Sequence, residues 1–313
     1  MVRAVQYEVG QKRAWDEFVD AAKNGVFLFK RDYIEYHADR FPDASLMFFD
    51  EDERLVALLP ATSNEPDVLS SHAGLTFGGV VSGDSMKAGL MLEVFDALLA
   101  HARGAGFTRL IYKAIPHIYH RVPAEEDLYA LFRNGAHLFR RDVSSTIDMN
   151  ERLPFSKGRK WSIKQALKSG VEVAQSFDFE TFMAIEERVL GARHGIRPVH
   201  TAAELRFLAD RFPDQIKLFA ASRTGEMLAG VVIYESQRVA HAQYIAATDA
   251  GKAAGAVDLV INHLINDYYV GKKFFDFGIS TEEGGRQLNA GLVENKQGFG
   301  GRAVAYDFYE IEL

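Results

Sequence analysis

Polar residues that could carry out acid–base chemistry follow an apolar stretch near the C-terminus. Asp276 and Ser280 alternate with large apolar residues in FDFGIS, the pattern of a strand with one polar face. Glu282 and Glu283 come directly afterwards. A carboxylate at the end of such a strand could accept the proton of an attacking amine or hydroxyl. The alternative is that Asp276 caps a turn and the glutamates are simply solvated, as exposed glutamates usually are.

A lysine, Lys296, lies further on in the glycine-rich stretch NAGLVENKQGFGG. A lysine held in place there could stabilise a developing oxyanion or bind a phosphate. An ordinary surface lysine is the alternative interpretation. The pattern alone does not decide between them.

Two further segments could bind an anion. The turn TDAGKAAGA at residues 248–256 joins a predicted strand to a predicted helix, and Gly251, Gly255 and Lys252 could bring backbone N–H groups and charge to a ligand. It does not match GxxxxGK[ST], so nucleotide hydrolysis gains no support, and a simple turn is the alternative. In the predicted helix 157–169, four lysines share one face, which could bind a polyanion or be solvated: Lys157, Lys160, Lys164 and Lys168.

Composition narrows the functional classes. The chain has 313 residues, no cysteine and a net charge of −7, which disfavours disulfides, a thiol nucleophile and general nucleic-acid binding. The histidines are scattered without metal-binding spacing, and no GxSxG motif occurs, so we expect neither a metal site nor a serine hydrolase. No apolar run is long enough to span a membrane and no secretory signal is visible, so we expect a cytoplasmic protein.

An internal repeat predicts the domain organisation. The hexapeptide ADRFPD occurs at Ala38–Asp43 and again at Ala209–Asp214, and each copy precedes a predicted strand, charged turn, strand, helix and strand. We therefore predict an α/β fold with mixed sheets, formed by two duplicated domains at residues 1–150 and 151–313. Ligands of open α/β sheets bind beyond the carboxyl ends of strands, which points to the ends of QYIAAT and FDFGIS.

The C-terminal segments resemble the GNAT-fold acyltransferases, and more closely their Fem-type branch, which joins two GNAT-like halves. The resemblance lies in QYIAATDAGKAAGAVDLV, in FDFGISTEEGGRQLNAGLVENKQGFGGRAVAYDFYEI, in KGRKWSIKQALKSG and, in the first half, in SSHAGLTFGG. Lys296, Phe299 and Gly300 match the Fem-type motif KxxFG. The turn Gly251–Ala256 follows the GNAT pyrophosphate-binding pattern only loosely.

The resemblance implies acyl transfer from acetyl-CoA or another acyl-CoA to an amine, without a metal. The acceptor would be an amino sugar or another cell-envelope precursor. The alternatives are a Fem-type aminoacyl transferase that uses aminoacyl-tRNA, and a non-catalytic ligand-binding module. The implied catalytic residues are Lys296, Asp276 and Glu282, with Glu283 as a further candidate base. The implied donor-binding residues are Tyr244, Ile245, Ala246, Gly251, Lys252, Gly255, Ala256, Ser280 and Asn289, and the implied acceptor-binding residues of the first half are Lys30, Arg31, His72, Thr76 and Gly78.

Overall fold

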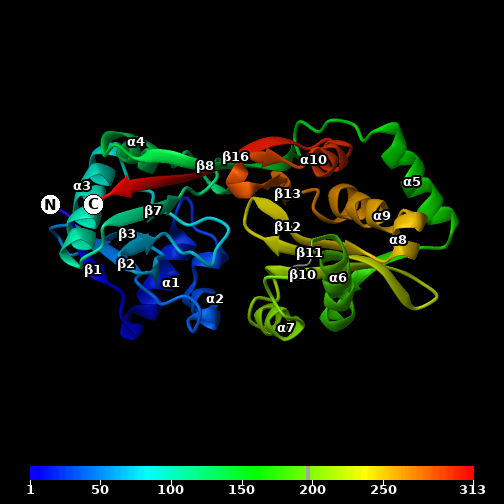
Figure 1. The fold of residues 1–313 in the computed structure, drawn as a ribbon, viewed down its shortest axis with the longest axis horizontal. Coiled ribbons are helices and arrows are strands. Elements are labelled where there is room, and N and C mark those ends of the chain that lie inside the picture. Colours follow the sequence, from blue (N-terminus) through cyan, green and yellow to red (C-terminus); the bar gives the residue numbers. More distant parts are fainter. Residues whose placement is uncertain (195–197) are drawn as a thin grey trace. The chain divides into compact units, whose positions relative to one another are not determined.

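The computed structural model describes residues 1–194 and 198–313, and these form two units (Figure 1). The predicted boundary at residue 150 differs from the observed division, because each unit takes residues from both halves of the sequence. The first unit contains Met1–Val143, Thr281–Gln287 and Ala305–Leu313, and the second contains Ser144–Ser280 and Leu288–Val304.

The first unit combines an antiparallel sheet of order β1-β2-β3-β6 with a parallel pair, β5 and β7. Helix α1 begins at Lys12 and buries Trp15 and Val19. In chain order the elements are β1 (Arg3–Gln6), α1 (Lys12–Ala21), α2 (Arg31–Ile34), β2 (Leu46–Phe49), β3 (Leu55–Leu59), β4 (Thr62–Glu65), β5 (Val68–Ser70), β6 (Val81–Ser82), α3 (Ala88–Gly104), β7 (Arg109–Lys113), α4 (Glu126–Arg133), the first part of β8 (His137–Asp148) and, much later, β14 (Thr281–Glu282), which pairs with β15 (Gln287–Leu288).

The second unit is built on one sheet, in which β12 and β13 are parallel and the other neighbours are antiparallel. Thr201 is the N-cap of helix α7 and forms a capping box with Glu204. The elements are α5 (Lys157–Lys168), β9 (Glu172–Ser176), α6 (Phe179–His194), α7 (Ala202–Arg211), β10 (Ile216–Arg223), β11 (Glu226–Glu235), β12 (Val239–Ala247), α8 (Asp249–Ala254), α9 (Ala256–His263) with a π-helical turn (Leu264–Tyr268), β13 (Phe274–Ile279) and α10 (Ala290–Gln297).

Helices α9 and α6 cover opposite faces of this sheet (Figure 1). Neighbouring strand residues point to opposite faces. Val231 of β11 belongs to the apolar core that contains Val260 of α9. At the preceding Gly230, an added Cβ would lie 2.5 Å from the Phe182 ring of α6. The sheet is therefore buried on both sides, as a parallel pair requires.

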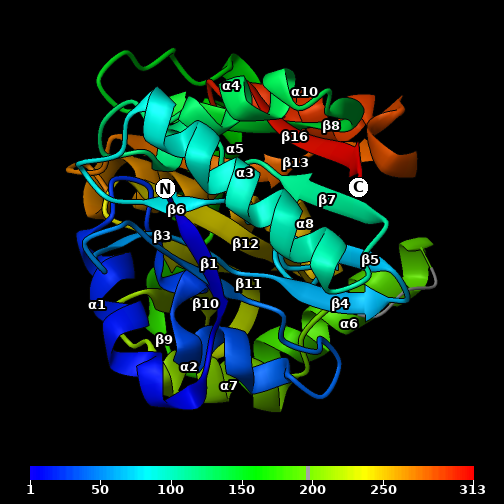
Figure 2. The same ribbon diagram turned by 90° about the vertical axis from the view of Figure 1, so that its left-hand side faces the viewer.

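Each half of the sequence supplies a strand to the unit formed mainly by the other half. Residues Phe308–Glu312 of β16 (Arg302–Glu312) pair with β7 in the first unit, as Figure 2 shows. Residues Ser144–Asp148 of β8 pair with β13 in the second unit. The exchange of these two strands between the repeats was not predicted from the sequence. The repeated order of strands, connecting helix and strands is otherwise observed in both units.

Candidate active site

Two β-bulges separate a pair of neighbouring strands in the second unit. The parallel pairing of β12 with β13 ends at His241 and Asp276. Immediately afterwards Gln243 of β12 is bulged out of register with β11, and β13 shifts its register with β8 between Asp276 and Ile279. In the described part of the chain, β12 beyond His241 has no strand partner on the side of β13. Backbone groups on that edge are available to a ligand.

The last parallel pair places an imidazole beside a carboxylate. His241 Nδ1 lies 2.7 Å from Asp276 Oδ2. The hydroxyls of Ser144 and Thr146 donate to Asp276 Oδ1 at 2.5 and 2.6 Å. The Asp276 side chain is 0% exposed, whereas that of His241 is 12% exposed. The histidine is therefore the member of the pair that solvent or a substrate can reach.

Asp276 is held as a carboxylate. Burial by itself raises the pKa of Asp276, but the hydrogen bond and charge of His241 and the two hydroxyl donors outweigh it, so the pKa lies below its usual value. A carboxylate at this position accepts a hydrogen bond from His241 Nδ1–H, which leaves Nε2 as the basic nitrogen. The pair can thus take a proton from an attacking nucleophile.

The bulge of β13 brings its backbone against the imidazole. Gly278 has φ +76°, and a Cβ there would lie 3.3 Å from His241 Cε1. A left-handed backbone conformation favours glycine. Gly278 therefore allows β13 to turn away from β12 without displacing His241.

Lys296 secures this bulge from helix α10. Its Nζ donates to the carbonyl oxygens of Gly278 and Ile279 and to Ser280 Oγ, each at 2.8 Å. An ammonium group has three donors, so all of them are used within the protein. Burial lowers the pKa of Lys296 to about 8, and the charge of Asp276 opposes that shift. This geometry fits a residue that positions β13, whereas the sequence suggested one that contacts the donor.

We expect Lys296→Met to destabilise the protein by about 2–4 kcal/mol and to lower activity with it. The variant leaves one buried hydroxyl and two partly buried carbonyls without their donor. The loss of a donor costs about 1–3 kcal/mol for a fully buried group and less for a carbonyl that water can reach. Lys296→Ala adds a cavity and should be destabilised further. Urea unfolding measures the change in the free energy of unfolding. A Lys296→Met protein with unchanged stability and no activity would instead show direct contact with the substrate.

The predicted donor-binding residues fall into two groups. Tyr244, Ile245 and Ala246 lie on the edge of β12 that β13 has left, and the Tyr244 hydroxyl is 2.6 Å from His200 Nδ1. The side chains of Ser280 and Asn289 form hydrogen bonds within the protein. Ser280 accepts from Lys296, and the Asn289 side chain caps α10 by accepting from the N–H of Leu292.

The glycines of the predicted anion-binding turn serve close packing. Residues 248–256 form the short helix α8, which breaks at Gly255 before α9. A Cβ at Gly251 would lie 2.1 Å from the carbonyl oxygen of Leu228, and one at Gly255 would lie 2.4 Å from Ser162 Oγ of α5. These glycines therefore let α8 approach β11 and α5, and binding of a donor at this turn stays a prediction. Ala256 is fully buried.

A small hollow does lie beside α8, on its side toward α6. It has a volume of about 110 Å³, and Lys252 and Arg188 contribute two positive charges to its lining. Lys252 also forms an exposed ion pair with Asp249 at 2.8 Å. The remaining lining residues are Ile185, Val189, Ala247, Thr248 and Asp249. Because Ala247 ends β12, this hollow lies at the end of the open edge.

A second buried acid, Glu186, lies on α6. Burial raises its pKa to about 7. Its helix packs on the sheet through Phe182, one turn earlier. A carboxyl group with this pKa could also act as a base near neutral pH. The sequence analysis did not single out Glu186, because a helical glutamate carries no signal of burial.

Glu282 and Glu283 are exposed and belong to the first unit. Lys296 and Asp276 belong to the second unit, and the chain passes from that unit to the first directly after Ser280. Contact of Glu282 with a substrate stays a prediction.

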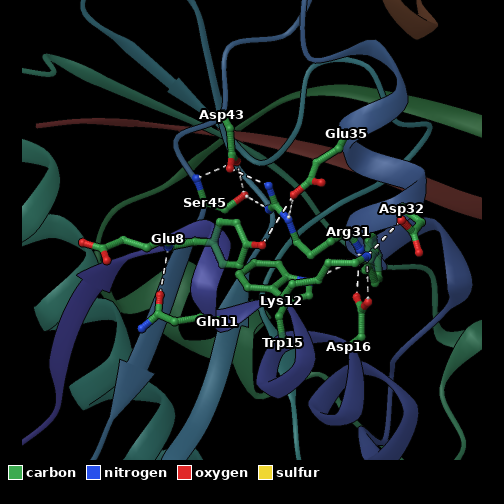
Figure 3. Close-up of polar contacts among 12 residues, drawn as sticks. Glu8, Gln11, Lys12, Trp15, Asp16, Arg31, Asp32, Glu35, Asp43 and Ser45 are labelled. Carbon is green, nitrogen blue, oxygen red and sulfur yellow. Dashed lines mark hydrogen bonds and ion pairs between the residues drawn. The ribbon is translucent and has the colours of Figure 1, made fainter.

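The predicted acceptor-binding residues of the first unit are mostly buried. Arg31 is 1% exposed and donates to Glu35, Asp43 and Ser45 at 2.9, 2.6 and 3.2 Å, as Figure 3 shows. Its guanidinium also lies 3.7 Å from the centre of the Tyr7 ring. This network stabilises the unit, so contact of Arg31 with an acceptor would require rearrangement.

The other predicted acceptor-binding residues differ in exposure. Lys30 pairs with Asp20 at 2.7 Å. His72 is fully buried, and a Cβ at Gly78 would lie 2.0 Å from the carbonyl oxygen of Ser71. Thr76 is exposed. Burial of His72 and Gly78 argues against direct contact with an acceptor, and only Thr76 and Lys30 keep a surface position.

Within the first unit, the segment after β5 occupies the position beside β7 that stays open beside β13 in the second unit. After β5 the chain runs through β6, which pairs with β3, and Gly78 N–H donates to the carbonyl of Lys113 in β7. Lys113 Nζ in turn donates to the carbonyls of His72, Ala73 and Leu75. This segment lies along β3 and β7, so the candidate active site is that of the second unit.

His241 is the functional candidate that the sequence analysis missed. The two strands are aligned so that His241 of β12 lies beside Asp276 of β13, and each is the one polar residue among the three that its strand contributes to this pairing. His241 can be recognised as a candidate only when the register of β12 against β13 is known, and the residues of either strand alone do not provide that register.

Comparison with known proteins agrees with this architecture. Residues 157–283 match the model of the acetyltransferase (GNAT) domain. Among solved structures, FemX has a TM-score of 0.71 at 11% identity, over 99% of this chain and 97% of that one. A tandem GNAT protein from the clavulanic acid biosynthesis pathway has a TM-score of 0.54 at 12% identity, over 100% and 98%. No curated protein matches the sequence.

A third similar structure is the C-terminal domain of a putative lysylphosphatidylglycerol synthetase from Agrobacterium fabrum. Its TM-score is 0.59 at 15% identity, over 94% of this chain and 91% of that one. At such identities the similarity shows the fold. Residues 157–283 thus match a GNAT acetyltransferase domain, and the two-domain fold is similar to those of FemX and the tandem GNAT protein. All but the last three matched residues lie in the second unit.

Proposed function

We propose that the protein transfers an acyl group from acyl-CoA to an amine, with His241 as the general base. The observation that carries the proposal is the His241–Asp276 pair at the point where β12 and β13 separate. A GNAT acetyltransferase domain over these residues supports an acyl-CoA donor. No group of three or more acidic, histidine or cysteine side chains in residues 1–194 and 198–313 is arranged to hold a metal ion.

The proposed reaction needs one base and one oxyanion site. The neutral amine attacks the thioester carbonyl, a C–N bond forms, and His241 Nε2 takes the amine proton while Asp276 holds Nδ1–H. Backbone N–H groups on the open edge near Tyr244–Ala246 would stabilise the oxyanion. The C–S bond then breaks, and the proton passes to the thiolate of coenzyme A. The hollow with Lys252 and Arg188 supplies charge for the donor's phosphates.

Acyl-CoA should stabilise the intact chain against thermal unfolding. A ligand at about 100 times its Kd adds about 2.7 kcal/mol to the free energy of unfolding. The assay pairs this shift with release of free coenzyme A thiol in the presence of amino sugars and other amines. Lys252→Gln should weaken the shift, whereas Lys87→Gln, an exposed lysine of the first unit, should leave it unchanged. Absence of any shift with acetyl-CoA or longer acyl-CoA would contradict the proposal.

A Fem-type aminoacyl transferase that uses aminoacyl-tRNA is the second candidate function. The observation that favours it is the row of four exposed lysines on α5, because a basic face can bind a polyanion. A salt-sensitive thermal shift with tRNA, without one for acyl-CoA, would support it. A non-catalytic binding module is the third candidate, and binding of acyl-CoA without turnover of any amine would favour it.

Localisation and partners remain proposals. No described helix is both apolar and long enough to cross a bilayer. We propose a cytoplasmic enzyme whose partners are a small-molecule acyl donor and an amine acceptor, with the first unit on the acceptor side and the second on the donor side.

A further inference from the structure

Helix α5 presents an unusual outer face. Its solvent-facing arc carries four lysines at i, i+3, i+7 and i+11, and at about 100° per residue Trp161 and Leu167 border that arc on its two sides. The helix contains no acidic residue. Trp161 is 66% exposed and Leu167 is 59% exposed. The four lysines of this face, which we call the α5 face, are Lys157, Lys160, Lys164 and Lys168.

The opposite side of α5 is firmly attached to the second unit. Ile163 and Ala166 are buried in the core. Arg159 forms an ion pair with Asp258 of α9 at 2.6 Å, and Ser162 donates to the same carboxylate at 2.8 Å. Figure 1 shows α5 running along the outside of the unit beside α8 and α9. The α5 face is therefore a fixed part of the surface.

The charges of this face are not compensated within the protein. None of the four lysines forms an ion pair with a residue in the described parts of the chain, although acidic residues outnumber basic ones overall. Ion pairs occupy many other basic side chains, such as Lys12, Lys23 and Lys217. An isolated positive stripe on a protein of net charge −7 is complementary to an anionic surface.

We propose that the α5 face docks the protein on an anionic lipid bilayer, in addition to its proposed activity. The lysines would contact lipid headgroups, and Trp161 and Leu167 would enter the interface between headgroups and acyl chains. The two apolar side chains favour lipid over nucleic acid, because leucine offers no ring on which a base can stack. The interaction is peripheral and reversible.

Tryptophan fluorescence gives a site-specific test. The chain has two tryptophans, and Trp15 is 0% exposed, so spectral changes of the folded protein report on Trp161. The full chain is mixed with phosphatidylcholine vesicles with and without phosphatidylglycerol, and sedimentation is measured in parallel. We expect binding only with phosphatidylglycerol, a blue shift of the emission, and weaker binding at higher salt.

Matched variants distinguish binding through the α5 face from a general effect of the protein's net charge. Each lysine near an anionic membrane contributes about fivefold in affinity, so Lys160→Gln with Lys164→Gln should weaken binding on the order of 25-fold. The control, Lys87→Gln with Arg103→Gln, removes the same charge from exposed positions of the first unit and should bind normally. Equal loss in both variants, or no binding to anionic vesicles, would overturn the proposal. Quenching of Trp161 by an RNA oligomer without vesicle binding would also overturn it, in favour of a nucleic-acid surface.

Discussion

His241→Gln should reduce kcat/KM by about 10²–10⁴-fold, the usual contribution of a positioned general base. Glutamine retains a side-chain N–H that can donate to Asp276, so the buried carboxylate keeps a partner. It cannot accept a proton at neutral pH. The loss should therefore appear in turnover while acyl-CoA still stabilises the protein. Steady-state kinetics with free thiol detection, together with the thermal shift, measure both parts.

A second variant, Glu186→Gln, shows by comparison with His241→Gln which residue is the general base. Glu186 is another buried group of the second unit that could accept a proton near neutral pH. If His241 is the base, Glu186→Gln should remain active, and the limb of the pH–rate profile that reports deprotonation of the base should persist. Full activity in His241→Gln, with loss in Glu186→Gln, would assign the role to Glu186 and refute ours.

Separating the chain at residue 150 should leave two fragments that do not fold alone. Fragment 1–150 lacks the strand residues Phe308–Glu312 that pair with β7. Fragment 151–313 lacks Ser144–Asp148, which pair with β13, and with them both hydroxyls that donate to Asp276. Domains are stable by only about 5–15 kcal/mol, so loss of a central strand exceeds what either can tolerate. Circular dichroism and protease resistance provide the measurement.

A fragment with different ends is the control for this experiment. Residues 144–304 contain the whole second unit, including the donors to Asp276, and omit the part of β16 that pairs in the first unit. This fragment should be markedly more helical and protease-resistant than 151–313. Co-expression of 1–150 with 151–313 should restore folding, because together they contain every strand. A stable, cooperatively unfolding 151–313 fragment would show that the exchanged strand is dispensable.

Much of the fold follows from local sequence patterns. The repeated hexapeptide and the spacing of apolar residues in α3 and α9 predicted two similar units and the order of their elements. The exchange of β8 and β16 could not be predicted in this way. Both segments have the pattern of ordinary strands. The strand with which each one pairs is determined by packing in the complete sheet and not by its own residues.

The candidate active site was predictable only in part. Asp276 was identified, because an acidic residue within FDFGIS is out of place in an apolar strand. His241 was not, since one histidine in an alanine-rich strand carries no signal until its partner is known. The glycines at 251 and 255 have a packing role that the sequence did not indicate. Glycine permits close approach of any backbone or side chain, and here the approaching groups are Leu228 and Ser162 of the protein itself.

The exchange of strands has a consequence during synthesis. The N-terminal unit cannot complete its sheet until Ala305–Leu313 have left the ribosome, because β7 pairs with that segment. About 200 residues separate the end of β7 from Leu313, so at about 5–20 residues per second β7 lacks this partner for roughly 10–40 seconds. During that time β7 presents an unpaired edge, which is a template for aggregation. A prematurely terminated chain would keep that edge permanently, so loss of even the final few residues should mark the product for degradation.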